Sequence, residues 1–166
     1  MLDRIEPCHW EGDLMVGAAG ASAVVTLVER VTRFTILGHL PDIRHDSASV
    51  RDAVVAALAP LPAHLRRTLT WDQGTEMARH AAFAAALGTD VYFCEPHSPW
   101  QRPTNENTNG LLRDYFPKST DLSVHTTDDV ARVQAELNQR PRKVLAWDNP
   151  ADRMATLLET PFVLRR

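Results

Sequence analysis

The chain has 166 residues, of which 44% are hydrophobic and 23% charged, and its formal net charge is −3. This length holds one domain with a hydrophobic core, and an acidic chain is not a simple nucleic-acid coat protein, which would be basic. No apolar run reaches the roughly 18 residues of a membrane span, and acidic residues interrupt the N-terminal stretch where a signal peptide would be apolar. We therefore expect a cytoplasmic protein that makes no contact with a membrane.

Three short-linked strands are predicted first, at residues 9–17, 23–29 and 32–39. The second is rich in β-branched residues, and a Gly/Ala/Ser turn separates it from the first. Strands joined by such short links favour an antiparallel meander.

Helices and strands alternate after this meander. The further predicted elements are a helix at 50–59, a strand at 69–72, a helix at 75–87, a strand at 90–94, and helices at 104–116 and 127–139. Ser47 or Ser49 is the expected cap of the first helix, and Thr104 that of the third. With right-handed crossovers this order predicts an α/β fold, a mixed five-stranded sheet with helices on both faces, as a single domain over residues 1–166.

Two cysteines, Cys8 and Cys94, are too few for a disulfide framework. A zinc site made of Cys8, His9, Cys94 and His97 is conceivable. However, Cys8 and His9 are adjacent, so on a strand they would point to opposite faces. Buried structural thiols are the better interpretation.

Three acids fall where this architecture brings strands and a helix start together. Asp13 interrupts an apolar strand, Asp72 ends the fourth strand, and Glu106 lies in the first turn of the helix after a long loop. Any one of them alone is explained as a residue that faces water, but together they favour a Mg²⁺ or Mn²⁺ site at the carboxyl edge of the sheet. Glu11 shares the strand face of Asp13, either as its supporting partner or as a solvated charge.

Five segments carry a resemblance to a known family: HWEGDLMVG, TLVERVTRF, LTWDQGTEMARH, DVYFCEPHSPWQRPTNENTNGLLRDYFPKSTDLS and LNQRPRKVLAWDNPA. They resemble the integrase-type catalytic core of insertion-sequence transposases of the IS-thirty family, over about residues 9–152. The resemblance implies a ribonuclease-H-like fold and the Asp-Asp-Glu transposase mechanism.

This resemblance also implies which residues act, and on what. The metal-binding acids of the family fall on Asp13, Asp72 and Glu106, with 33 residues (73–105) between the last two, and they would hold two Mg²⁺ or Mn²⁺ ions. The implied reaction is DNA strand cleavage followed by strand transfer, in DNA integration and transposition. The implied partners are transposon ends and target DNA, on which the chain would assemble as a homo-oligomer.

Residues around the glutamate are expected to bind DNA. The family's basic residue seven positions after the glutamate falls on Arg113, and seven residues make two helical turns, so Arg113 shares the face of Glu106. An ordinary solvated arginine is the alternative. Asn107 flanks Glu106, and Trp100 in the preceding loop either stacks on an unpaired base or pins the loop to the core.

A basic motif near the C-terminus matches the family's closing motif. Arg140, Arg142 and Lys143 surround a helix-ending proline. We expect them to contact the DNA backbone or a partner subunit, and a structural role for Arg140 is the alternative.

The chain departs from the family pattern in two places. Pro103 stands where the family has glycine, and it fixes φ and removes an amide donor just before Glu106. The family's N-terminal helix-turn-helix region, which reads transposon ends, has no counterpart here, so we expect an isolated core. Two rival functions stay open: a ribonuclease-H-like nuclease, and a truncated, inactive remnant that acts as a weak DNA-binding or interaction module.

Overall fold

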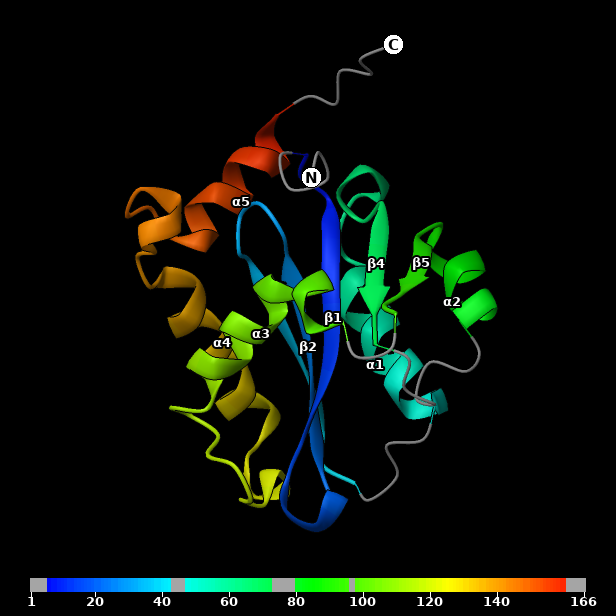
Figure 1. The fold of residues 1–166 in the computed structure, drawn as a ribbon, viewed down its shortest axis with the longest axis vertical. Helices are drawn as coiled ribbons and strands as arrows, with labels where there is room; N and C mark the ends of the chain where they lie inside the picture. The colour runs from blue at the N-terminus through cyan, green and yellow to red at the C-terminus, as the bar shows by residue number, and fades with distance from the viewer. Residues whose placement is uncertain (1–5, 43–46, 73–79, 96–97, 161–166) are drawn as a thin grey trace.

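The computed structural model describes residues 6–42, 47–72, 80–95 and 98–160, and five strands form one mixed sheet (Figure 1). The strands are β1 (His9–Val16), β2 (Ala23–Glu29), β3 (Thr35–Leu40), β4 (Thr68–Trp71) and β5 (Asp90–Phe93). Their order across the sheet is β3-β2-β1-β4-β5. The first three are antiparallel neighbours, whereas β4 and β5 run parallel to β1. The predicted meander and crossovers are confirmed.

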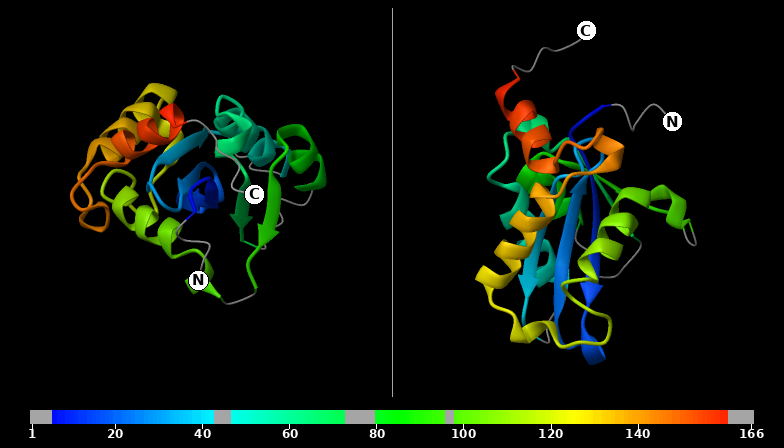
Figure 2. Two further views of the ribbon diagram at one scale, coloured as in Figure 1. Left: turned by 90° about the horizontal axis from the view of Figure 1, so that it is seen from above. Right: turned by 90° about the vertical axis from the view of Figure 1, so that its left-hand side faces the viewer.

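Helices cover both faces of the sheet, as predicted. They are α1 (Ser47–Leu58), α2 (His80–Leu87), α3 (Pro103–Leu112), α4 (Thr127–Gln139) and α5 (Pro150–Glu159). Figure 2 (left) shows α3 and α4, in lime green to orange, on the opposite side of the central strands from α1 and α2, in cyan and green. Within the described part of the chain, no helix has the length and apolar character of a membrane-spanning segment.

Each face of the sheet has its own hydrophobic core because side chains alternate along every strand. Val25 and Leu27 of β2 pack on one face with residues of α1 and α2. Val24 of the same strand packs on the other face with Leu112 of α3 and Leu137 of α4. The alternation in β1 leaves Glu11 and Asp13 on the α3 side of the sheet, where α3 crosses β1 and β2.

The third strand starts at Thr35, three residues later than predicted, because Glu29 organises a turn before it. The Glu29 carboxylate accepts hydrogen bonds from the amides of Val31 and Thr32, at 3.0 and 2.6 Å. Arg33 follows in the left-handed region at a φ of 63°. Hydrogen bonds from backbone amides to this buried carboxylate thus replace strand pairing at Val31 and Thr32.

Two further helix predictions need correction. Thr104 does not cap α3: Arg102 is the N-cap residue, no side chain caps this end, and Pro103 occupies the first turn, where a missing amide costs little. Helix α3 also ends at Leu112 instead of 116. Of the predicted helix at 75–87, residues 80–87 form α2 and residues 75–79 lie outside the described part.

Helix α1 begins at Ser47, so Ser49 lies inside it rather than at its cap. Helix α5 was not predicted, and its signal is local: the Asn149 side chain accepts a hydrogen bond from the amide of Asp152 at 2.8 Å, with Pro150 in the first turn. Both cysteines are free and buried, as predicted, and His97 of the conceivable zinc site lies outside the described residues.

Candidate active site

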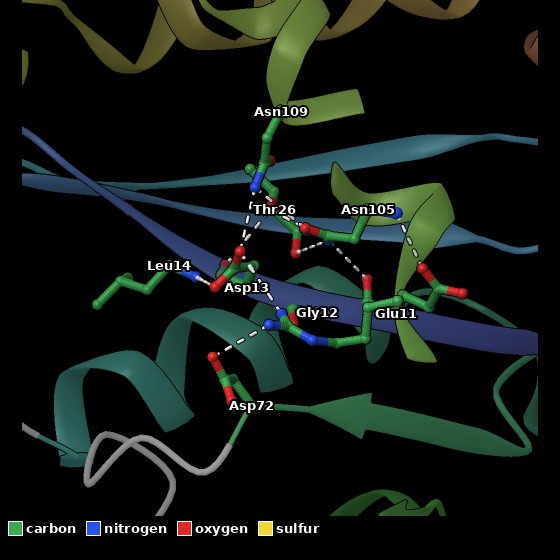
Figure 3. A network of polar contacts seen from close by, with 9 residues as sticks. Glu11, Gly12, Asp13, Leu14, Thr26, Asp72, Asn105 and Asn109 are labelled. Carbon is green, nitrogen blue, oxygen red and sulfur yellow. Dashed lines mark hydrogen bonds and ion pairs between the residues drawn. The ribbon is translucent and has the colours of Figure 1, made fainter. Parts of the chain in front are cut away.

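The register between β1 and β4 brings Asp13 and Asp72 together. In this parallel pair the first three residues of β1 each lie beside the residue 59 positions later, as Glu11 lies beside Thr70. Asp13 and Asp72 have the same offset and lie one two-residue step further along. Because side chains two residues apart share a face of the sheet, both carboxylates emerge on the α3 side (Figure 3).

Gly12 allows the two strand ends to come this close. An added Cβ on Gly12 would lie 2.4 Å from Cε3 of the fully buried Trp71. The indole ring therefore occupies the volume that a side chain would need on the opposite face from Asp13. Trp71 directly precedes Asp72, so this packing fixes the position of the Asp72 backbone at the end of β4.

Arg102 joins the two acids, and the sequence analysis did not identify it. Its Nη2 lies 3.0 Å from Oδ2 of Asp72, and its Nη1 lies 3.5 Å from Oδ2 of Asp13. Nη1 also donates to the carbonyl oxygen of Gly12 at 3.1 Å. The Arg102 side chain is 8% exposed, whereas those of Asp13 and Asp72 are 27% and 54% exposed. One buried cation thus contacts two carboxylates that open to solvent, and it balances only one of their two negative charges.

The charges of this group perturb one another. Burial raises the pKa of Asp13 above its usual value, and repulsion from Asp72 adds to this, while Arg102 and the amide of Leu14 oppose it. Burial by itself would lower the pKa of Arg102, but attraction to Asp13 and Asp72 outweighs it and raises that pKa. A positive charge bound between these two carboxylates therefore stabilises the site, because the carboxylates would otherwise repel each other.

Buried polar contacts dock α3 on the sheet beside these acids. The Asn105 amide donates to Oε2 of Glu11 at 2.8 Å, and its side chain donates to the Glu11 carbonyl at 3.1 Å. Asn109, one turn later, donates to Oδ2 of Asp13 at 3.1 Å (Figure 3). Glu11 is 1% exposed and its Oε1 lies 3.2 Å from Nε of Arg30. Glu11 is thus a supporting residue, and the solvated alternative is wrong.

Glu106 lies on α3 next to this cluster. Arg102 precedes it by four residues and Asn109 follows it by three, and both contact Asp13. Residues at these spacings share one helix face, so Glu106 belongs to the stripe of α3 nearest the two aspartates. Glu106 is exposed. Among the residues that the structure describes, no three His, Cys, Asp or Glu side chains lie close enough to hold a metal ion. The structure therefore joins Asp13 with Asp72 and leaves Glu106 beside them.

Three residues predicted to bind DNA lie on α3 or next to it in the chain. Trp100 is 68% exposed, so its ring does not pin the loop to the core. Asn107 is exposed on α3, next to Glu106. Arg113 follows the last residue of α3 and is half-buried, and its Nη1 donates weakly to the Phe116 carbonyl oxygen at 3.4 Å.

The C-terminal basic motif gathers positive charge after α4. Arg140 and Lys143 are exposed. Arg142 is half-buried and donates from Nη2 to the Leu137 carbonyl oxygen at 3.3 Å, so part of its role is to satisfy the end of α4. Burial, and then repulsion from Arg140 and Arg33, lowers the pKa of Arg142.

The fold is that of the ribonuclease-H-like catalytic cores of retroviral integrases. The catalytic core domain of BIV integrase superposes with a TM-score of 0.67 at 14% identity, covering 90% of this chain and 94% of that chain. A chain of the simian T-cell lymphotropic virus intasome, solved with PP2A regulatory subunit B56 gamma, gives 0.69 at 17% identity, covering 93% and 55%. At these identities the likeness concerns the fold, and it confirms the predicted fold class.

The chain belongs to the integrase core domain family, whose model matches residues 3–99. It is 53% identical over 159 residues to the transposase for insertion sequence element IS1086 of Cupriavidus metallidurans, covering 96% of this chain and 46% of that protein. It is 50% identical over 144 residues to transposase InsI for insertion sequence element IS30A of Escherichia coli, covering 87% and 37%. The predicted family is confirmed, and the chain spans less than half the length of these relatives.

Proposed function

We propose that this chain is the catalytic core of a DNA transposase, which cleaves a DNA strand and joins its 3′-hydroxyl to target DNA with the help of divalent metal ions. The observation that carries the proposal is the convergence of Asp13 and Asp72 on one cation at the edge of the sheet. The transposases of similar sequence support DNA as the substrate.

The acids fit a divalent cation such as Mg²⁺ or Mn²⁺. Two carboxylates already face a common position that holds positive charge, and both are partly open to solvent, from which the remaining ligands of the ion come. Glu106 on the adjoining stripe of α3 is the proposed third ligand. When bound, two such ions would activate the attacking oxygen and stabilise the leaving oxygen of an in-line displacement at phosphorus.

The protein's own groups set the geometry for this reaction. Asp13 would serve both ions, because it lies between Asp72 on the neighbouring strand and the α3 stripe that carries Glu106. Asn109 orients the Asp13 carboxylate, and the buried contacts between Asn105 and Glu11 keep α3 at a fixed distance from the sheet. No covalent bond between enzyme and DNA is needed.

The DNA would run along the exposed side of α3 toward the end of α4. Trp100 offers an exposed aromatic face for an unpaired base, and Asn107 and Arg113 follow along α3. The basic motif of Arg140, Arg142 and Lys143 would then hold the phosphate backbone. We propose assembly of several copies on DNA as the working form.

Cleavage assays with uncut transposon-end duplexes and strand-transfer assays with pre-cleaved ends, both in the presence of Mn²⁺, test this proposal. Asp13→Asn, Asp72→Asn and Glu106→Gln should each abolish both cleavage and transfer. Asp90→Asn and Glu159→Gln, exposed acids of β5 and α5, are matched controls and should stay active. Loss of activity in the controls as well, or full activity in a variant of the acidic cluster, would contradict it.

The same assays, with an RNA–DNA hybrid added as a second substrate, separate the rival functions. A ribonuclease-H-like nuclease would cleave RNA–DNA hybrid in preference to transposon ends and would transfer no strand. An inactive remnant would bind DNA without cleaving it, and the acidic substitutions would change nothing.

A further inference from the structure

Arg102 occupies the position in which the proposed metal ions would have to bind. Its guanidinium contacts Oδ2 of both Asp13 and Asp72, at 3.5 and 3.0 Å. Mg²⁺ holds its oxygen ligands at about 2.0–2.1 Å, so an ion shared by the same two oxygens leaves no room for a guanidinium between them. The two positive charges would also repel each other at this short distance.

We propose that Arg102 is an internal counter-ion that competes with the divalent metal for Asp13 and Asp72, so that metal binding requires Arg102 to leave the site. The inference rests on the proposed function, because it assumes a metal at these acids. It adds a step that precedes the chemistry, and it assigns Arg102 as the positioning residue of the metal-free state.

The surroundings of Arg102 suit a side chain that exchanges between two places. Its Nε is buried and has no hydrogen-bond partner, so the ion-paired position leaves one donor unsatisfied. Leaving this position would relieve the cost of that unsatisfied donor. Arg102 is also the N-cap residue of α3 with non-helical backbone angles, φ −130° and ψ 48°, so its movement need not unwind the helix.

The release of Arg102 would link the metal site to DNA. The exposed Trp100 is two residues away, on the same connection between β5 and α3. In the proposed exchange, the guanidinium that leaves Asp13 and Asp72 would turn toward this connection, where DNA is proposed to bind. There a phosphate could replace the carboxylates as its partner. Metal and DNA would then bind with positive cooperativity, since each favours the released position of Arg102.

A measurement of Mn²⁺ affinity distinguishes competition from simple structural support. If Arg102 only held the site together, its removal would weaken metal binding. If it competes, Arg102→Gln should bind Mn²⁺ about tenfold more tightly than the wild type, since the ion no longer has to displace a guanidinium from the two carboxylates. Arg102→Lys keeps the positive charge but lacks the forked guanidinium that contacts both carboxylates. Its Mn²⁺ affinity should therefore lie between those of the wild type and Arg102→Gln. Arg51→Gln, on α1, is the matched control and should bind like the wild type.

Isothermal titration of the metal-free protein with MnCl₂, with and without a DNA duplex, gives these affinities directly. Circular dichroism of each variant shows that it is folded, and the Lys variant keeps the test open if the Gln variant unfolds. Equal or weaker Mn²⁺ binding by Arg102→Gln and Arg102→Lys, in a protein whose binding is lost in Asp13→Asn, would overturn the competition and leave the proposed function standing. Mn²⁺ binding that Asp13→Asn does not reduce in any background would overturn both.

Discussion

Gly12→Ala tests whether the packing beneath the acidic cluster sets its geometry. The new methyl group would lie 2.4 Å from Cε3 and 2.5 Å from Cζ3 of Trp71, well inside contact distance, and 3.1 Å from Cδ1 of Leu69. Trp71 is fully buried and its ring is rigid, so β1 and β4 must separate or the indole must rotate. Overpacking of a well-filled core typically costs about 1–3 kcal/mol.

The expected result is a loss of unfolding free energy of that size, with a fall in Tm of roughly 2–4 °C per kcal/mol for a chain of this length. Gly110→Ala is the matched control: nothing lies within 4 Å of its added Cβ, and it stands inside α3. Alanine is the better helix former there, so this control should stabilise the protein by about 0.4–1 kcal/mol. Urea denaturation followed by circular dichroism measures both variants.

A second substitution identifies the cause. Trp71→Leu frees the volume beside position 12, so the double variant should show a coupling energy of about 0.5–3 kcal/mol that offsets part of the Gly12→Ala loss. Additive effects of the two substitutions, or a Gly12→Ala protein as stable as the Gly110→Ala control, would refute the view that Trp71 sets the separation of the strand ends.

Three further substitutions test the polar contacts. Glu11→Ala leaves the Arg30 guanidinium without its carboxylate, so we expect a loss of about 3–5 kcal/mol in urea unfolding; a loss below 1 kcal/mol would show that the pair is dispensable. The pKa of Asp13 is raised in the folded protein, so Asp13 lowers stability as the pH rises through its folded pKa. Metal-free Asp13→Asn should therefore melt at a higher temperature than the wild type at pH 7, and this gap should close as the pH falls below that pKa; a constant gap would contradict the assignment. Arg113→Ala should reduce the salt dependence of DNA binding by about one unit of slope, whereas Arg132→Ala on α4 should not.

Patterns within single elements predicted most of the fold. The β-branched run of β2 and the apolar stripe of α4 over Thr127–Gln139 needed no tertiary information, and both elements have the predicted limits. Errors arose where a distant group replaces a local signal. The start of β3 depends on the Glu29 carboxylate, which also accepts the amide of Cys8, a residue 21 positions earlier.

In the candidate site, too, residues with a local sequence signal were predictable and residues that depend on distant contacts were not. Asp13 and Asp72 were predictable, because one stands inside an apolar strand and the other ends a strand at the carboxyl edge of the sheet. Arg102 was not, since its partners lie 90 positions away in β1 and 30 positions away after β4, and only the register of those strands brings them to it. Glu11 left two alternatives open in the sequence, and burial beneath α3 decides between them.

A crystal structure of this chain grown with Mn²⁺, with anomalous differences recorded near the manganese absorption edge, tests the central claim most directly. The account predicts an anomalous peak bound by carboxylate oxygens of Asp13 and Asp72, a second bound by Asp13 and Glu106, and the Arg102 guanidinium withdrawn from both aspartates. A Mn²⁺-saturated crystal in which Arg102 still bridges Asp13 and Asp72, with any anomalous peak lying elsewhere, would contradict it.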